Sequence, residues 1–182
     1  MPGGLHLDLH TDDVRGLADR VDALGGSTSH HMLGYVIFGS PGGLTFCLVG
    51  HPGGRRPPPQ EWPGGRSIVD QVCLDIPPSR WDAERDFWAS LTGWEWAHAG
   101  DREFRRLARP EGIPLAFLLQ RLDDEQPTVT AHLDLACDDR DAETSRQQAL
   151  GAERVRRTDG FTVMRDPSGR AYCNTGRAPG DV

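Results

Sequence analysis

The chain has 182 residues, of which 37% are hydrophobic and 26% charged, a balance typical of a folded globular protein. Its net charge of −7 disfavours nucleic acid and other polyanions as partners. No apolar run approaches the roughly 20 residues that a membrane span requires, so we expect no membrane association. The four cysteines do not form a disulfide framework and the N-terminus lacks the features of a signal peptide, so the predicted location is cytoplasmic.

The first predicted unit occupies residues 1–52. Residues 6–10 alternate between polar and apolar side chains, which predicts a strand, and the aspartates after them are suited to cap a helix that ends at Gly25. A polar strand follows, then a strand that ends in a proline-glycine turn at residues 40–43, then a strand that carries Cys47. The predicted order is one strand, one helix and three strands, or βαβββ.

The middle of the chain predicts a linker and a second unit. Residues 53–66 contain three consecutive prolines, which indicates a stiff, extended linker. After it, a strand over residues 69–76 and a helix over residues 79–92 are expected, the helix from apolar residues at helical spacing. Three further strands are predicted over residues 94–96, 103–109 and 113–122. This is a divergent second βαβββ unit.

The last part of the chain repeats the first. Residues 5–52 align with residues 131–178 without a gap. The clearest matches are His6-Leu7-Asp8-Leu9 with His132-Leu133-Asp134-Leu135, Asp12-Asp13 with Asp138-Asp139, Ala23-Leu24-Gly25 with Ala149-Leu150-Gly151, and Cys47 with Cys173. The repeat predicts a third βαβββ unit with a helix over residues 138–150, and so an α+β fold.

The order and spacing of several motifs point to a known family. They are Phe87-Trp88, Leu91-Thr92-Gly93-Trp94-Glu95, His132-Leu133-Asp134-Leu135, Ala149-Leu150-Gly151-Ala152 and Asp166-Pro167-Ser168-Gly169. In these motifs the chain resembles the glyoxalase-like branch of the vicinal oxygen chelate (VOC) superfamily, the glyoxalase, bleomycin resistance and dioxygenase fold. The resemblance implies paired βαβββ modules that form an open curved-sheet barrel, with helices outside and a cleft that binds small molecules.

The resemblance also implies a domain organisation with an odd number of modules. Residues 67–182 would form one complete domain, and residues 1–52 would be half of another. Either the chain is truncated at its N-terminus, or the lone module pairs with its counterpart in a second copy. The inward face of the lone module, with His6, Asp8 and Cys47, would otherwise be uncovered. We expect a homodimer through the N-terminal module.

Metal-dependent members of the superfamily place ligands on four strands that face the cleft. Carried over to this chain, the four positions are Gln71, Gln120, His132 and Cys173. One imidazole, two amides and a thiol suit Fe(II), Mn(II) or Ni(II) poorly, and glutamine is an uncommon zinc ligand. We therefore expect no catalytic metal and no other cofactor. The alternative is a divalent metal ion held by His132, Gln71 and Gln120.

Other residues are candidates for the cleft. His132 and Asp134 alternate on one strand and share a face, either as an acid–base or ligand-orienting pair or, as we favour, as a structural hydrogen bond. Cys73 is either a nucleophile activated by His132 or, as we favour, a buried structural thiol. Trp94 and Trp96 share a strand face, in the core or in an aromatic wall of the cleft.

The predicted function is that of a glyoxalase-like protein that binds an unidentified small molecule between paired modules, without a catalytic metal. The drug-sequestering resistance proteins of the superfamily are examples of such binding proteins. The alternative is a metal-dependent VOC enzyme, a lyase, isomerase or dioxygenase, so whether this chain is an enzyme stays open. The expected cleft residues are Gln71, Cys73, Trp94, Trp96, Gln120, His132, Asp134 and Cys173.

Overall fold

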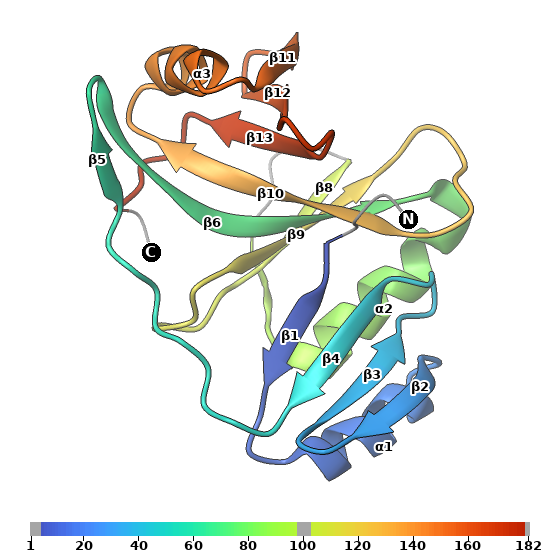
Figure 1. Ribbon diagram of the computed structural model, residues 1–182. Coiled ribbons are helices and arrows are strands. Elements are labelled where there is room, and N and C mark those ends of the chain that lie inside the picture. Colours follow the sequence, from blue (N-terminus) through green and yellow to red (C-terminus); the bar gives the residue numbers. More distant parts are fainter. Residues whose placement is uncertain (1–4, 98–102, 181–182) are drawn as a thin grey trace.

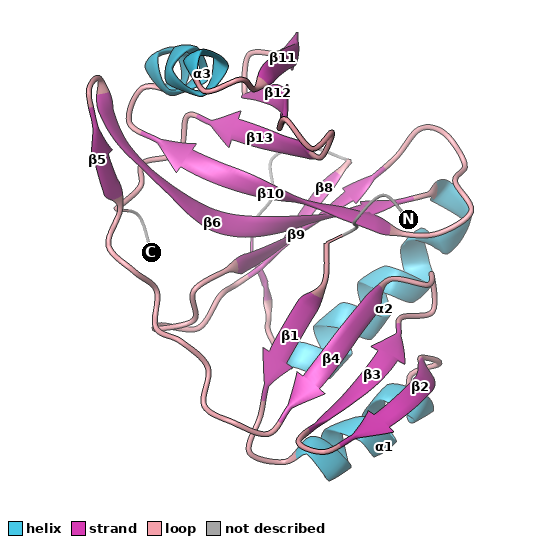
Figure 2. Ribbon diagram, in the orientation of Figure 1, coloured by secondary structure: helices cyan, strands magenta, loops and turns pink. Residues whose placement is uncertain are grey.

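The computed structural model describes residues 5–97 and 103–180 (Figure 1). It has the expected α+β architecture, with three βαβββ modules, curved sheets that do not close and helices on their outer faces (Figure 2). None of the helices in the described residues is long and apolar enough to cross a membrane.

The first module forms a four-stranded sheet of its own, in the order β1-β4-β3-β2. Its elements are β1 (Leu7–His10), α1 (Val14–Ala23), β2 (Ser27–Met32), β3 (Tyr35–Gly39) and β4 (Thr45–Val49). The Asp13 side chain caps α1 by accepting the N–H of Gly16 at 2.8 Å, and Gly25 follows the helix with a φ of 84°. Both ends of the helix were therefore predictable from these residues.

The second and third modules share a nine-stranded sheet. The second contains β6 (Gly65–Ile76), the 3-10 turn η1 (Pro78–Arg80), α2 (Trp81–Thr92), β7 (Trp96–Ala97), β8 (Phe104–Leu107) and β9 (Ala116–Arg121). The third contains β10 (Thr130–Cys137), α3 (Arg140–Ala149), β11 (Glu153–Arg157), β12 (Phe161–Arg165) and β13 (Ala171–Thr175). The first strands of the two modules, β6 and β10, pair antiparallel and so join the modules.

The segment predicted as a linker has secondary structure at its end. Strand β5 (Gln60–Trp62) pairs with the start of β6 through a turn in which Gly64 and Gly65 have φ angles of 102° and 139°. The Trp62 indole donates to Ser67 at 2.9 Å, and the guanidinium of Arg146 lies 4.0 Å from the centre of the Trp62 ring. These contacts stabilise a short hairpin that the three prolines before it do not reveal. The division of the chain into domains stays a prediction.

Helix α2 lies between the two sheets and joins them in one hydrophobic core. An aromatic series runs from the first module through α2 to the larger sheet. Phe38 stacks on Phe46 at 5.5 Å, Phe46 meets Trp88 edge-on at 5.2 Å, and Trp88 stacks on Phe117 at 5.2 Å. All four side chains are at most 4% exposed. The first module is therefore packed against the second through its helix-facing side.

Candidate functional site

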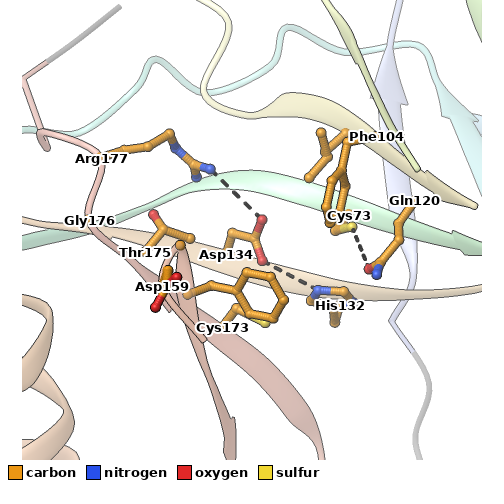
Figure 3. Close-up of a pocket in the computed structure, with 13 residues that line it drawn as sticks. Cys73, Phe104, Gln120, His132, Asp134, Asp159, Cys173, Thr175, Gly176 and Arg177 are labelled. Carbon is orange, nitrogen blue, oxygen red and sulfur yellow. Dashed lines mark hydrogen bonds and ion pairs between the residues drawn. The ribbon is translucent and has the colours of Figure 1, made fainter. Parts of the chain in front are cut away.

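A cavity of about 420 Å³ lies on the sheet face where β6 and β10 pair (Figure 3). Its floor is formed by side chains of four strands: Cys73 from β6, Leu118 and Gln120 from β9, His132 and Asp134 from β10, and Cys173 from β13. Phe104 and Phe161 add aromatic walls, and Arg177 follows β13 at the edge of the cavity. Five of the eight residues expected in the cleft meet here.

His132 is held between two carboxylates. Its Nδ1 lies 2.9 Å from Asp75 Oδ2 and its Nε2 lies 3.4 Å from Asp134 Oδ1. Burial lowers the pKa of His132, but its interactions with Asp134 and Asp75 outweigh this effect and raise the pKa above its ordinary value. The two carboxylates therefore favour the imidazolium form. Nδ1 is within hydrogen-bonding distance of Asp75, whereas Asp134 Oδ1 has no hydrogen-bond partner among the described residues.

The two thiols of the cavity are protonated. Burial raises the pKa of Cys73 to about 12, although the neighbouring His132 opposes the shift. Burial raises the pKa of Cys173 as well, again against the effect of His132. Because the thiolate is the reactive form, neither cysteine has the environment of a nucleophile. Cys73 instead donates a weak hydrogen bond to Gln120 Oε1, with the sulfur 3.8 Å from the oxygen.

Two donors face Asp134 Oδ2. It accepts a hydrogen bond from Gln71 Nε2 at 2.7 Å. Arg177 Nη1 lies 4.0 Å from the same oxygen (Figure 3). Arg177 also pairs with Asp70 at 2.6 Å. The pair of His132 and Asp134 expected from their alternation therefore belongs to a larger charged network, in which each group has an opposite charge within reach.

The strand pairing shows which residues occupy equivalent places in the three modules. The aspartate of each first strand pairs in register with a residue of the last strand of its module: Asp8 with Cys47, Asp75 with Gln120, and Asp134 with Cys173. Cys73 lies two residues before Asp75, as His132 lies two residues before Asp134. Cys73, not Gln71, therefore takes the place of the histidine.

Three of the expected cleft residues lie outside the lining of this cavity. Gln71 is 1% exposed and lies beneath the cavity, where it contacts Asp134. Trp94 packs edge-on against Phe117 with ring centres 5.7 Å apart, and Trp96 is 40% exposed. The sequence does not show whether a tryptophan lies in the core or in a wall of the cavity, because both positions require an apolar side chain.

The structure also adds residues that the sequence analysis missed. Asp75 had a signal, since Leu74-Asp75 matches Leu133-Asp134 in the third module. No sequence feature separates Phe104, Phe161 and Arg177 from other aromatic or basic residues, because they reach the cavity only through the curvature of the sheet.

Comparison with known proteins decides the family. Residues 71–175, more than half of the chain, match the glyoxalase-like domain family. The chain belongs to the glyoxalase-like family of the VOC superfamily. A search of curated proteins found no match.

Solved structures share this VOC fold at low sequence identity. A Mn(II)-bound glyoxalase from Novosphingobium aromaticivorans is 20% identical, with a TM-score of 0.64 over 93% of this chain and 62% of that chain. A triple mutant of 4-hydroxymandelate synthase from Streptomyces coelicolor is 17% identical, with a TM-score of 0.59 over 97% and 71%. A halotolerant catechol dioxygenase is 14% identical, with a TM-score of 0.59 over 93% and 66%. The chain thus spans between 62% and 71% of these proteins.

The donor groups of this glyoxalase-like cavity test which metal the site would accept. The ligand atoms of Cys73, His132 and Asp134 lie within 4.8 Å of one another. Mn(II) and Fe(II) prefer oxygen and neutral imidazole ligands, so the thiol of Cys73 suits them poorly. Zn²⁺ accepts thiolate, imidazole and carboxylate, so it is the ion that these three residues would hold after losing two protons.

Proposed function

We propose that this glyoxalase-like chain binds a small organic molecule in the cavity between its second and third modules, without a catalytic metal. The observation that carries the proposal is the charged environment of His132. Carboxylates lie 2.9 Å from its Nδ1 and 3.4 Å from its Nε2 and favour the protonated ring, so a metal ion would have to displace a proton from it. The two neighbouring thiols would have to lose their protons as well, and burial raises the pKa of both.

The walls of the cavity support an organic ligand with an apolar body. Phe104, Leu118 and Phe161 line one part, whereas His132 and Arg177 bring positive charge and Asp134 negative charge to another. A concave site with mostly apolar walls and a few convergent polar groups is the usual form of a small-molecule site. Such a cavity excludes water from an apolar group and orients its polar end.

The binding proposal is tested with the fluorescent probe anilinonaphthalene sulfonate, which has an aromatic body and one charged group. We expect one probe per chain and loss of that binding in Leu118→Trp, because an indole at this wall fills the cavity. Leu118→Met is the matched control and retains binding. Equal binding by Leu118→Trp, with the same circular dichroism spectrum as the unchanged chain, would show that the probe does not occupy this cavity and would overturn the proposal.

A metal-dependent VOC reaction is the second candidate function. Two observations favour it: the proximity of the ligand atoms of Cys73, His132 and Asp134, and the presence of Mn(II) in one of the structures with the same fold. A metal held there would act as a Lewis acid toward an oxygen of the substrate. Elemental analysis of protein purified without added metal separates the two. About one ion per chain that is lost in His132→Ala would favour the metal-dependent reaction.

A further inference from the structure

A second cluster of metal-binding side chains lies in the first module, outside the lining of the cavity. His6 precedes β1, Asp8 lies on β1, and Cys47 lies beside Asp8 on β4. Their ligand atoms, one from each residue, all lie within 4.8 Å of one another. His6 Nε2 is 3.0 Å from Asp8 Oδ1. The proposed ligand cavity uses none of these residues.

This cluster is the counterpart of His132, Asp134 and Cys173 in the repeat, but its surroundings differ. His132 has a carboxylate on each ring nitrogen. His6, by contrast, contacts a carboxylate only through Nε2, within the part of the chain that the structure describes. The side chains of His6 and Asp8 are 49% and 53% exposed. The same triplet therefore occurs once in a closed charged network and once in an open position that an ion reaches from solvent.

We propose that His6, Asp8 and Cys47 form a binding site for Zn²⁺. Two ligand atoms that each lie about 2.0–2.1 Å from a tetrahedral zinc ion are about 3.3 Å apart. The 3.0 Å separation of His6 Nε2 and Asp8 Oδ1 is close to that value. An ion placed between them would replace their hydrogen bond, with each atom contributing a lone pair.

The types of ligand select zinc over the common hard cations. Ca²⁺ and Mg²⁺ bind oxygen ligands, whereas an imidazole and a thiolate suit Zn²⁺. Three protein ligands leave one tetrahedral position for water or another ligand. Cys47 is 3% exposed and must release its proton to solvent when its sulfur binds the ion. Zinc binding is therefore expected to become tighter as the pH rises.

The site is tested with Co²⁺ as a spectroscopic substitute for Zn²⁺, added to the full chain. A cobalt ion bound to a thiolate gives a charge-transfer band in the near ultraviolet, and displacement by Zn²⁺ removes it. We expect about one Co²⁺ per chain, loss of the band in Cys47→Ala, and retention of the band in Cys173→Ala, which is the matched change in the repeat.

Two further variants guard against a misfolded Cys47→Ala protein. His6→Gln and Asp8→Asn alter half-exposed side chains, so both should keep the circular dichroism spectrum of the unchanged chain. Each should weaken Co²⁺ and Zn²⁺ binding at least about tenfold, the lower limit for residues that only support a metal ligand. The absence of a cobalt band, or a band that survives in these variants and disappears in Cys173→Ala, would overturn the proposal. Neither result would bear on the binding of an organic probe in the cavity.

Discussion

At the scale of single residues, His132 shows why a buried charge requires its partners. Its side chain is 14% exposed, and the carboxylates of Asp75 and Asp134 face it at 2.9 Å and 3.4 Å. Removal of one partner from a buried charged group leaves the rest uncompensated, which costs about 3–5 kcal/mol. We therefore expect His132→Ala to lower the free energy of unfolding by about that amount, measured by urea titration near neutral pH. A loss no larger than that of a substitution on the surface would contradict this account.

Glu84 on α2 is a buried carboxylate that joins two modules. It is 0% exposed and accepts hydrogen bonds from the backbone N–H of Gly42 and, at 2.7 Å, from the indole of Trp88. Burial raises its pKa above the usual value of 4.5, although these hydrogen bonds and one with Ser40 oppose the shift. The loop between β3 and β4 is thereby attached to the second module.

The raised pKa of Glu84 predicts a pH dependence of stability. The folded chain binds this proton more tightly than the unfolded chain, so the contribution is complete below pH 4.5 and is lost as the pH rises through the folded-state pKa. Glu84→Gln lacks this titration. We expect the stability of the unchanged chain to fall relative to Glu84→Gln as the pH rises from 4.5, in urea titrations at a series of pH values. A constant difference between the two proteins would show that Glu84 titrates alike in both states.

At the scale of elements, α3 is attached to its sheet by polar side chains. Gln147 is 7% exposed, donates to Asn174 at 3.2 Å, and accepts from Asn174 at 2.7 Å and from Tyr172 at 2.9 Å. Thr144 Oγ1 accepts a further hydrogen bond from Asn174 Nδ2 at 3.2 Å. The position of α3 relative to the sheet is therefore set by a hydrogen-bond network rather than by an apolar stripe.

Two adjacent glutamines of α3 allow a matched test. Gln147→Ala leaves buried groups of Asn174 and Tyr172 without partners, which we expect to lower the free energy of unfolding by about 1–3 kcal/mol. Gln148 is exposed, and Gln148→Ala should change stability by less than about 0.5 kcal/mol. Both are measured by chemical denaturation. Equal effects of the two substitutions would rule out a specific role for the buried network.

The same elements show how far sequence reasoning reaches. Helix ends were predictable because Asp13 and Asp139 are caps and Gly25 and Gly93 take left-handed conformations. The register of β6 was not, because the second module has diverged from the repeat and a side-chain period of two allows Gln71 and Cys73 equally. Most residues of the cavity floor were therefore among those expected in the cleft, whereas its aromatic walls depend on sheet curvature and were not predicted.

At the scale of the whole molecule, the three modules differ in what lies beside their first strands. β6 and β10 pair with each other, antiparallel, over eight pairs of residues that include His132 with Cys73. Among the described strands, β1 pairs only with β4 and so has one unpaired edge. One face of this small sheet is covered by the aromatic core that includes α2. The unpaired edge of β1 is thus the place where the pattern of the other two modules is incomplete.

This edge predicts self-association. An open strand edge offers backbone donors and acceptors to another strand, and a two-fold pairing would satisfy both copies at once. The pairing of β6 with β10 is an example, within the chain, of two first strands that pair antiparallel. We expect a dimer through β1, seen as a doubled mass in size-exclusion chromatography with light scattering at micromolar concentrations. Dilution should separate the copies while the circular dichroism spectrum stays the same, because each copy keeps its own core. A mass equal to one chain across the whole concentration range would show that the edge of β1 does not pair with a second copy.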